Sequence, residues 1–276
     1  MLRVLAYITL FSLGGYVAVG LLEQKMIYPF DSTRVSPAKA GVPNLTEKTL
    51  EVDGAQLVTW VAAPRGGKPV ILYFHGNAGN LANRAGRFRR FTERGYGLVA
   101  MAYRGSSGST GTPSQKAITA DVRTLYRHLD RVLKSDNPRV LYGESLGTGV
   151  VILGLLASAV TDAEKGAGPP AAVVLEAPYS SILDVALGMS PQLEPLSKFL
   201  TSTWESAANA RYIKSPLLVI HGTEDAFIPI AQGRKVFAAA ATNDKQFLAV
   251  KGGGHTDLWR SDVLPHLWRF IDRSSR

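Results

Sequence analysis

The chain has 276 residues, of which 46% are hydrophobic and 19% charged, a balance typical of a globular protein with one large core. It contains no cysteine, which excludes thiolate chemistry, disulfides and cysteine-based zinc sites. The formal net charge is +9, but the basic residues are scattered and not interleaved with aromatic residues, so we expect no nucleic-acid binding.

Residues 4–22 form an uncharged apolar stretch near the amino terminus. As a helix, such a stretch would span roughly 28 Å at about 1.5 Å per residue, close to the hydrocarbon thickness of a bilayer. We therefore predict a single-pass membrane anchor in residues 1–25, with Tyr28 near the interface, and a folded domain in residues 26–276. A cleaved signal peptide ending near Ala18-Val19-Gly20 is the alternative. The positive charges on the two flanks nearly balance, so the side of the membrane stays open.

Apolar runs alternate with helical patterns through the rest of the chain. Leu45–Val52 and Gln56–Ala62 flank Asp53-Gly54, a dipeptide typical of a hairpin turn. Short apolar runs typical of strands buried on both faces follow at Val70–Phe74, Leu98–Tyr103, Val140–Tyr142, Ala172–Leu175, Leu217–Ile220 and Gln246–Val250. Helical patterns lie between them, one reaching Arg94 and others covering Ala117–Leu133 and Val150–Ala157.

This alternation predicts parallel βαβ units, and hence an α/β fold with a mostly parallel twisted sheet and helices on both faces. Residues 179–215 interrupt the alternation with Pro191, Pro195 and short helical pieces. We expect this excursion to form a small helical cap over the carboxyl edge of the sheet, where open α/β folds bind their ligands.

The segment Gly143-Glu144-Ser145-Leu146-Gly147 stands between a predicted strand and a predicted helix. So tight a strand-to-helix turn strains its central residue and tolerates only small residues two positions away. Gly143 and Gly147 meet that need, so the pattern matches a G-x-S-x-G nucleophile elbow that exposes the Ser145 hydroxyl. The same pattern also arises by chance or as a packing device, so the interpretation depends on partners for Ser145.

A serine nucleophile needs an imidazole base, and the imidazole needs a carboxylate that fixes its tautomer. Among the five histidines, His255 is the best base, because it follows three glycines after the last strand. His75 and His221 end buried strands and are expected to pack against the backbone, whereas His128 and His266 lie in predicted helices. For the acid we favour Asp225 or Glu224, which follow the penultimate strand, over the alternatives Glu176 and Asp257, the latter expected to start a helix.

An oxyanion formed by attack on a carbonyl needs N–H donors that are already in place. We assign the first to Leu146, at the start of the elbow helix, and the second to Asn77, in the loop after the strand Val70–Phe74. No metal and no cofactor is expected at this site.

The sequence resembles the α/β-hydrolase superfamily, and within it a membrane-tethered branch that includes fungal bud-emergence hydrolases and animal protein depalmitoylases. The resemblance extends over nearly the whole chain and rests on the matching stretches Met26–Pro29, His75–Asn80 (HGNAGN) with Arg84, Tyr103–Gly105, Gly108–Ser114, Gly143–Gly147, Glu176–Tyr179, His221–Asp225 and Gly254-His255 with Trp259. It implies an α/β-hydrolase fold and the catalytic triad Ser145, Asp225 and His255.

We therefore predict a membrane-anchored serine hydrolase that cleaves a carboxylic ester or thioester of a small molecule or lipid through an acyl-enzyme. The alternatives are a serine peptidase of the same fold and a non-catalytic binding module at the membrane. A basic cluster on the helix that reaches Arg94 is expected to form a solvated face and is a candidate contact with anionic lipid; it consists of Arg84, Arg87, Arg89, Arg90 and Arg94.

Overall fold

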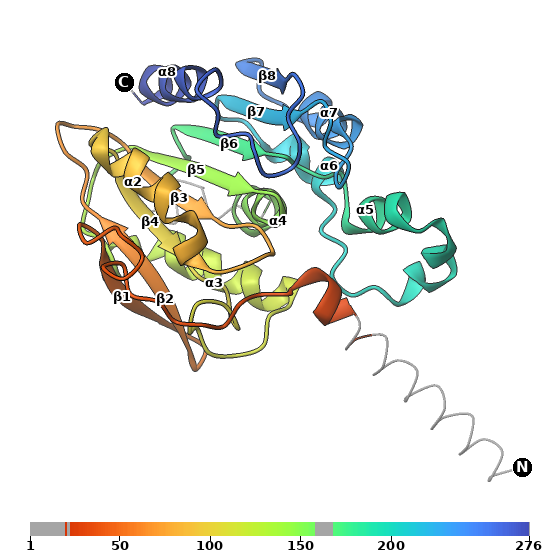
Figure 1. The fold of residues 1–276 in the computed structure, drawn as a ribbon, viewed down its shortest axis with the longest axis horizontal. Coiled ribbons are helices and arrows are strands. Elements are labelled where there is room, and N and C mark those ends of the chain that lie inside the picture. Colours follow the sequence, from red (N-terminus) through yellow and green to blue (C-terminus); the bar gives the residue numbers. More distant parts are fainter. Residues whose placement is uncertain (1–19, 21–22, 158–167, 276) are drawn as a thin grey trace, which may run out of the picture.

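The computed structural model describes residues 20, 23–157 and 168–275. An eight-stranded sheet runs through the molecule in the order β1-β2-β4-β3-β5-β6-β7-β8 (Figure 1). The strands are β1 (Thr46–Val52), β2 (Ala55–Ala62), β3 (Val70–Phe74), β4 (Gly97–Met101), β5 (Arg139–Glu144), β6 (Ala172–Glu176), β7 (Leu217–Gly222) and β8 (Lys245–Val250). Strands β3 to β8 pair in parallel, whereas β1–β2 and β2–β4 are antiparallel. The predicted α/β-hydrolase fold with a mostly parallel sheet is confirmed.

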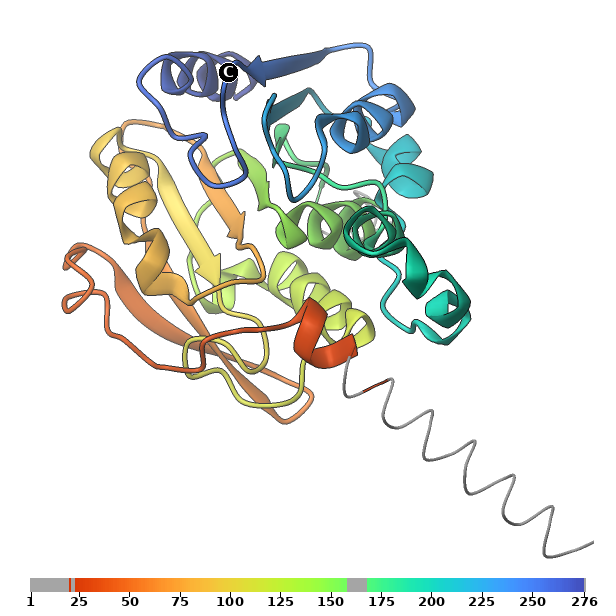
Figure 2. The ribbon, with the colours of Figure 1, turned by 45° about the vertical axis from the view of Figure 1, so that its right-hand side comes forward.

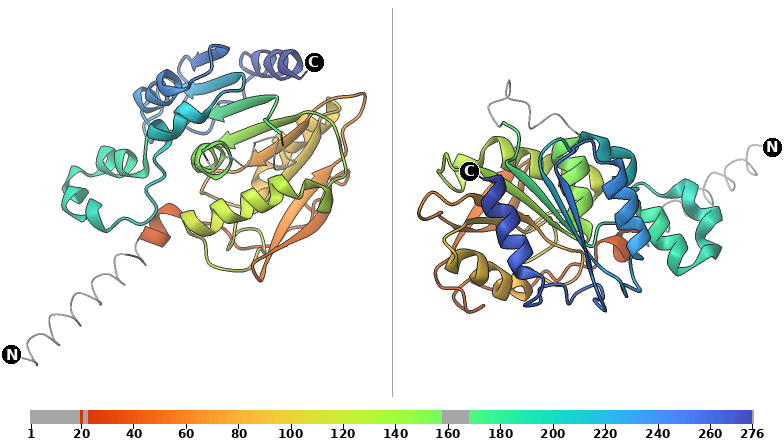
Figure 3. Two further views of the ribbon diagram at one scale, coloured as in Figure 1. Left: turned by 180° about the vertical axis from the view of Figure 1, so that it is seen from behind. Right: turned by 90° about the horizontal axis from the view of Figure 1, so that it is seen from above.

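Helices cover both faces of the sheet (Figures 1 and 3). Side chains of β3 alternate between two cores, as the two-residue period of a strand requires. Val70, Leu72 and Phe74 pack in one core with α3 (Gln115–Arg127), the π-helix Val150–Leu156 and α7 (Ile230–Ala239). Ile71 and Tyr73 pack in the other core with α2 (Ala85–Glu93) and α8 (Leu264–Ser274). Because both faces are buried, every residue of β3 is apolar, which explains the continuous run in the sequence.

The excursion between β6 and β7 is helical. It contains α5 (Ile182–Met189), a 3-10 segment Pro191–Phe199, α6 (Ser206–Asn209) and a 3-10 turn Ala210–Tyr212. The part around α5 projects beyond the carboxyl ends of the strands (Figures 1 and 2). It is the small helical cap that the sequence predicted.

The predicted anchor in residues 1–25 lies almost wholly outside the described residues. Within the residues that are described, no helix is both long and apolar enough to cross a bilayer. The expectation that Tyr28 lies at a membrane interface is wrong. Its ring is buried, and its hydroxyl accepts a hydrogen bond of 2.9 Å from Trp204 Nε1, so this tyrosine joins the amino-terminal segment to the end of the cap.

The buried helix expected after the elbow is present: it begins as α4 (Leu146–Gly149) and continues as the π-helix. Two other predictions need correction. Asp257 does not start a helix; it lies in a loop, where its Oδ1 accepts a 2.7 Å bond from the Gly254 N–H. The basic cluster is not one solvated face, because Arg84 and Arg87 turn inward and form buried ion pairs while Arg89, Arg90 and Arg94 stay exposed.

Candidate active site

The elbow places Ser145 on a strained turn between β5 and α4. Its φ is +50° and its ψ is −114°, a conformation that L-residues rarely adopt. A Cβ at residue 147 would lie 1.9 Å from the Phe74 carbonyl oxygen, and one at residue 143 would lie 2.6 Å from the Gly147 oxygen. Both positions therefore require glycine, which is the physical reason for the sequence pattern around this serine.

His255 contacts Ser145 on one side and Asp225 on the other. Its Nε2 lies 3.0 Å from Ser145 Oγ, and its Nδ1 lies 2.8 Å from Asp225 Oδ2. A carboxylate only accepts hydrogen bonds, so Nδ1 carries the proton and Nε2 is left to accept the serine hydroxyl proton. Three side chains far apart in the sequence thus form one hydrogen-bonded chain.

The loops that carry Asp225 and His255 approach each other closely. The Glu224 N–H donates to the Gly253 oxygen at 2.9 Å, and a Cβ at residue 222 would lie 2.2 Å from that oxygen. Gly222, at the end of β7, makes this close approach possible, because any side chain there would collide with the backbone of the His255 loop.

The Asp225 carboxylate is buried and fully engaged. Its Oδ1 accepts bonds from the Phe227 and Ile228 N–H groups at 3.0 and 2.8 Å, and His221 Nε2 lies 3.5 Å from Oδ2. Burial alone would raise the pKa of Asp225, but the hydrogen bonds from His221, His255 and the Ile228 N–H hold it well below its usual range. The group therefore stays a carboxylate at neutral pH.

The other candidate acids lie elsewhere. Glu224 is exposed, and Asp257 bonds to its own loop. Glu176 is buried with Arg87, Tyr142 and Trp259. Of the four carboxylates weighed from the sequence, the structure brings only Asp225 to His255.

The other four histidines are either exposed or buried within the fold, and none of them takes the place of His255. His128 and His266 are exposed. His221 is buried, with Nε2 at 2.8 Å from the Ile228 carbonyl oxygen, and therefore supports the Asp225 loop. His75 is buried against Tyr103, with ring centroids 4.2 Å apart, and its Nδ1 lies 2.7 Å from the Gly76 oxygen.

Burial and the nearby Arg84 charge lower the pKa of His75 to about 3. The unfolded chain binds a proton at this residue below about pH 6.5, whereas the folded chain does not until about pH 3. Protonation therefore favours unfolding, and stability is lost as the pH falls from 6.5 towards 3.

The unfolding free energy of the parent should fall between pH 7.5 and pH 5. We expect this fall to be about 2 kcal/mol smaller in His75→Phe, because phenylalanine cannot take up the proton. Urea unfolding of both proteins at the two pH values measures this difference, and any constant cost of the substitution cancels. Equal losses in the parent and the variant would contradict the assignment.

Asn77 and Leu146 flank the serine and line the same cavity. Leu146 opens α4, where the first N–H groups of a helix have no intrahelical partner and point out of its end. Asn77 lies in the loop after β3, and a Cβ at Gly76 would be 3.4 Å from Ser145 Cβ. The loop after β3 therefore packs against Ser145, and Leu146 follows it directly in the chain.

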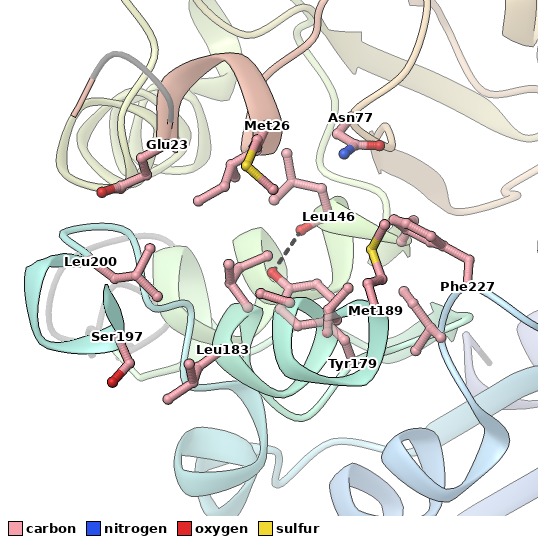
Figure 4. Close-up of a pocket in the computed structure, with 16 residues that line it drawn as sticks. Glu23, Met26, Asn77, Leu146, Tyr179, Leu183, Met189, Ser197, Leu200 and Phe227 are labelled. Atoms are coloured by element: carbon pink, nitrogen blue, oxygen red, sulfur yellow. Dashed lines mark hydrogen bonds between the residues drawn. The ribbon is translucent and has the colours of Figure 1, made fainter. Parts of the chain in front are cut away.

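A cavity of about 340 Å³ adjoins Ser145. Its walls are mostly apolar and come from the amino-terminal segment, α5 and the loop after β7, including Met26, Ile27, Leu183, Ala186, Met189 and Phe227. Figure 4 shows Asn77 and Phe227 at one end and Glu23 and Leu200 at the other. The lining therefore extends from the loops after β3 and β7 to the amino-terminal segment and the cap.

Sequence reasoning missed the role of Glu23. Its buried carboxylate accepts bonds from the N–H and hydroxyl of Thr201, both at 2.9 Å, and from the Ser202 N–H at 2.7 Å. The segment that follows the apolar stretch is thereby tied to the end of the cap and forms one wall of the cavity. The sequence feature that could have pointed to this role is the position of Glu23, an acidic residue directly after an apolar stretch.

Within residues 23–157 and 168–275, no group of three or more histidine, aspartate or glutamate side chains is arranged so that it could hold a metal ion. Ser145, His255 and Asp225 form a hydrogen-bonded chain beside an apolar cavity that Asn77 and Leu146 also line, an arrangement suited to acyl transfer.

The family comparison matches residues 66–209 to the serine aminopeptidases, S33. The chain is 30% identical to the uncharacterized protein Rv2307c of Mycobacterium tuberculosis, over 93% of this chain and 88% of that protein. It is also 30% identical to the lysophosphatidylserine lipase ABHD12 of Rattus norvegicus, over 75% of this chain but only 56% of the lipase, so it spans about half of that relative.

Among solved structures, the Pyrococcus furiosus esterase Pf2001 matches with a TM-score of 0.68 at 14% identity, over 90% of this chain and 100% of the esterase. At that identity the likeness concerns the fold. Together with the family match, it shows that the chain is a hydrolase of the α/β-hydrolase fold and belongs to the serine aminopeptidase S33 family.

Proposed function

We propose that this protein is a membrane-anchored serine hydrolase that cleaves carboxylic esters or thioesters through an acyl-enzyme, with Ser145, His255 and Asp225 as its catalytic triad. The observation that carries the proposal is the continuous chain of hydrogen bonds from Ser145 Oγ through His255 to Asp225 at the end of an apolar cavity. The anchor is the apolar stretch of residues 4–22.

In the first half of the reaction, His255 Nε2 takes the Ser145 proton as Oγ attacks the substrate carbonyl carbon. The N–H groups of Leu146 and Asn77 stabilise the negative charge that develops on the carbonyl oxygen. The imidazolium then returns its proton to the departing alkoxide or thiolate, which leaves the acyl group on Ser145. In the second half, His255 activates a water molecule that releases the acid.

The apolar lining of the cavity favours a lipid substrate whose acyl chain binds inside it. Apolar side chains line most of its length, and burying an acyl chain there contributes about 0.8 kcal/mol per methylene. A relative named as a lysophosphatidylserine lipase points to the same class of bond.

A peptidase is the second candidate, because the matching family model describes aminopeptidases. An aminopeptidase site needs a free carboxylate to bind the substrate ammonium group. Among the described residues that line the cavity, Glu23 is the one carboxylate, and three hydrogen bonds from Thr201 and Ser202 already occupy it. The ester hydrolase is therefore favoured.

Activity-based labelling tests the proposal. We expect a fluorophosphonate to modify the full-length protein in detergent at Ser145, as located by peptide mapping, and His255→Ala to label at least roughly 100-fold more slowly. The labelled protein should lose the hydrolysis of p-nitrophenyl esters, for which kcat/KM should rise with acyl length. A protein that neither labels nor cleaves esters would be a binding module, and cleavage of alanine p-nitroanilide in preference to esters would identify a peptidase.

A further inference from the structure

A buried network of two carboxylates and two guanidinium groups lies directly behind the nucleophile. Glu144 and Glu176 occupy paired positions on the adjacent strands β5 and β6. Arg84 Nη2 lies 2.9 Å from Glu144 Oε1, and Arg87 Nη1 lies 2.8 Å from Glu176 Oε2 and 3.7 Å from Glu144 Oε2. The network has no net charge, and the reaction described above does not use it.

Arg84 connects this network to the loop that carries Asn77. Its Nη1 donates to the carbonyl oxygens of Ala78 and Asn80, the latter at 3.3 Å. A Cβ at Gly76 would lie 3.1 Å from Glu144 Oε1 and 3.3 Å from Arg84 Nη2, so this loop lies directly on the ion pair. Glu144, the other partner, is the residue that precedes the nucleophile in the chain.

A third loop, which carries His255, reaches the same network through Trp259. Its Nε1 donates to Glu176 Oε2 at 2.9 Å and lies 3.1 Å from the Tyr142 hydroxyl. The Arg87 guanidinium carbon lies 5.1 Å from the centre of the Trp259 ring, within the range of a cation–π contact. Three loops of the candidate site thus share one set of partners.

Glu144 and its partner Arg84 remain ionised. Burial disfavours the Glu144 carboxylate, but the Arg87 and Arg84 guanidinium groups outweigh it and hold the pKa of Glu144 well below its usual range. A buried ion pair is weak evidence for stability, because well-packed apolar residues often serve as well. A role in fixing geometry is a better reason for its presence.

We infer that the Arg84–Glu144 ion pair is a positioning device that sets the distance between the Asn77 N–H and Ser145 Oγ, and with it the geometry of the oxyanion hole. This inference rests on the proposed serine-hydrolase function. The guanidinium holds the Asn77 loop through two carbonyl oxygens and holds the elbow through Glu144. Arg84 and Glu144 touch no reacting atom, so they act through Asn77 and Ser145.

The expected kinetic effect lies in kcat. The oxyanion exists only in the tetrahedral states, so a displaced N–H donor weakens the transition state and leaves ground-state binding in the apolar cavity largely unchanged. A displacement of about 1 Å is enough to reduce a rate by roughly 100-fold.

A second ion pair in the chain offers a matched control. Arg104 and Asp121 form a two-point pair at 2.9 and 2.7 Å, with side chains 13% and 0% exposed. Arg84 and Glu144 pair at 3.2 and 2.9 Å, with side chains 9% and 15% exposed. The control pair joins the loop after β4 to α3, so breaking it tests the cost of losing such a pair without touching the Asn77 loop.

The experiment compares Arg84→Met with Arg104→Met in the full-length protein, by kcat and KM for a p-nitrophenyl ester and by urea unfolding. We expect Arg84→Met to lower kcat roughly 100-fold with KM changed less than about threefold, and Arg104→Met to keep the parental kcat at a similar loss of stability. Arg84→Lys keeps the charge but not the fork that reaches both Glu144 and the carbonyls, so its kcat should lie between those of Arg84→Met and the parent.

Equal kcat values for Arg84→Met and Arg104→Met would overturn the inference while leaving the proposed function intact. A parent that shows no esterase activity and no labelling of Ser145 would instead overturn the proposed function. Where Arg84→Met does not fold, Glu144→Gln and its control Asp121→Asn decide. A loss of kcat only in Glu144→Gln supports positioning, and parental kcat in Glu144→Gln rejects it.

Discussion

Replacing Ser145 with alanine should lower kcat/KM for a p-nitrophenyl ester by roughly 10⁴- to 10⁶-fold. The substitution removes the one oxygen that bonds to His255 Nε2 and faces the cavity, so no acyl-enzyme can form. The oxyanion donors and the cavity remain, so a small residual rate is expected. The positive φ of this residue disfavours alanine as much as serine, and stability should change little.

Ser109→Ala is the matched control for this prediction. Ser109 and Ser145 are each 6% exposed, but the Ser109 hydroxyl donates to the Ala102 oxygen and accepts from the Val58 N–H. Its loss should cost stability, read from urea unfolding, and leave kcat/KM near that of the parent. Hydrolysis by Ser145→Ala within tenfold of the parent would reject Ser145 as the nucleophile.

The positions of the candidate site residues followed from the sequence because each lies just after a strand. Apolar runs such as Val70–Phe74 locate buried parallel strands, and the carboxyl ends of such strands meet at one edge. Ser145, Asp225 and His255 follow β5, β7 and β8, so their convergence was predictable. Position after β7 did not by itself separate Asp225 from Glu224, because that choice depends on how one turn points its side chains; the family resemblance favoured Asp225.

The inward-facing arginines were not predictable in the same way. Arg84 and Arg87 are three residues apart, a spacing that places them on one side of a helix but does not say which side faces the protein. Their partners, Glu144 and Glu176, stand some 60 and 89 residues later in the chain. Acidic residues that end two buried strands were a signal that some cation must lie beside them.

The amino-terminal segment makes long-range contacts that local sequence patterns do not reveal. Glu23, which was expected in the anchor, and Tyr28 both bind the cap, through Thr201 and Trp204. Such contacts join positions about 176 residues apart or more, and no local period encodes them. One wall of the cavity therefore comes from a segment for which the sequence predicted no role in the site.

Asp225→Asn should reduce kcat by about 10⁴-fold without unfolding the protein. The asparagine Oδ1 can still accept the Phe227 and Ile228 N–H groups, so the loop should keep its shape. Its amide group would face His255 Nδ1 as a donor and move the ring proton to Nε2. In that tautomer His255 cannot take the Ser145 proton, so the nucleophile is present but not activated.

Asp257→Asn provides the comparison that separates this effect from loop damage. Asp257 lies two residues past His255 and accepts the Gly254 N–H, so Asp257→Asn makes the same change from carboxylate to amide in the His255 loop without touching the imidazole. We expect kcat within about tenfold of the parent for Asp257→Asn, and equal unfolding midpoints for the two variants would show that the difference is chemical. A smaller loss of kcat in Asp225→Asn than in Asp257→Asn would mean that orientation of His255 by Asp225 is not what activates Ser145.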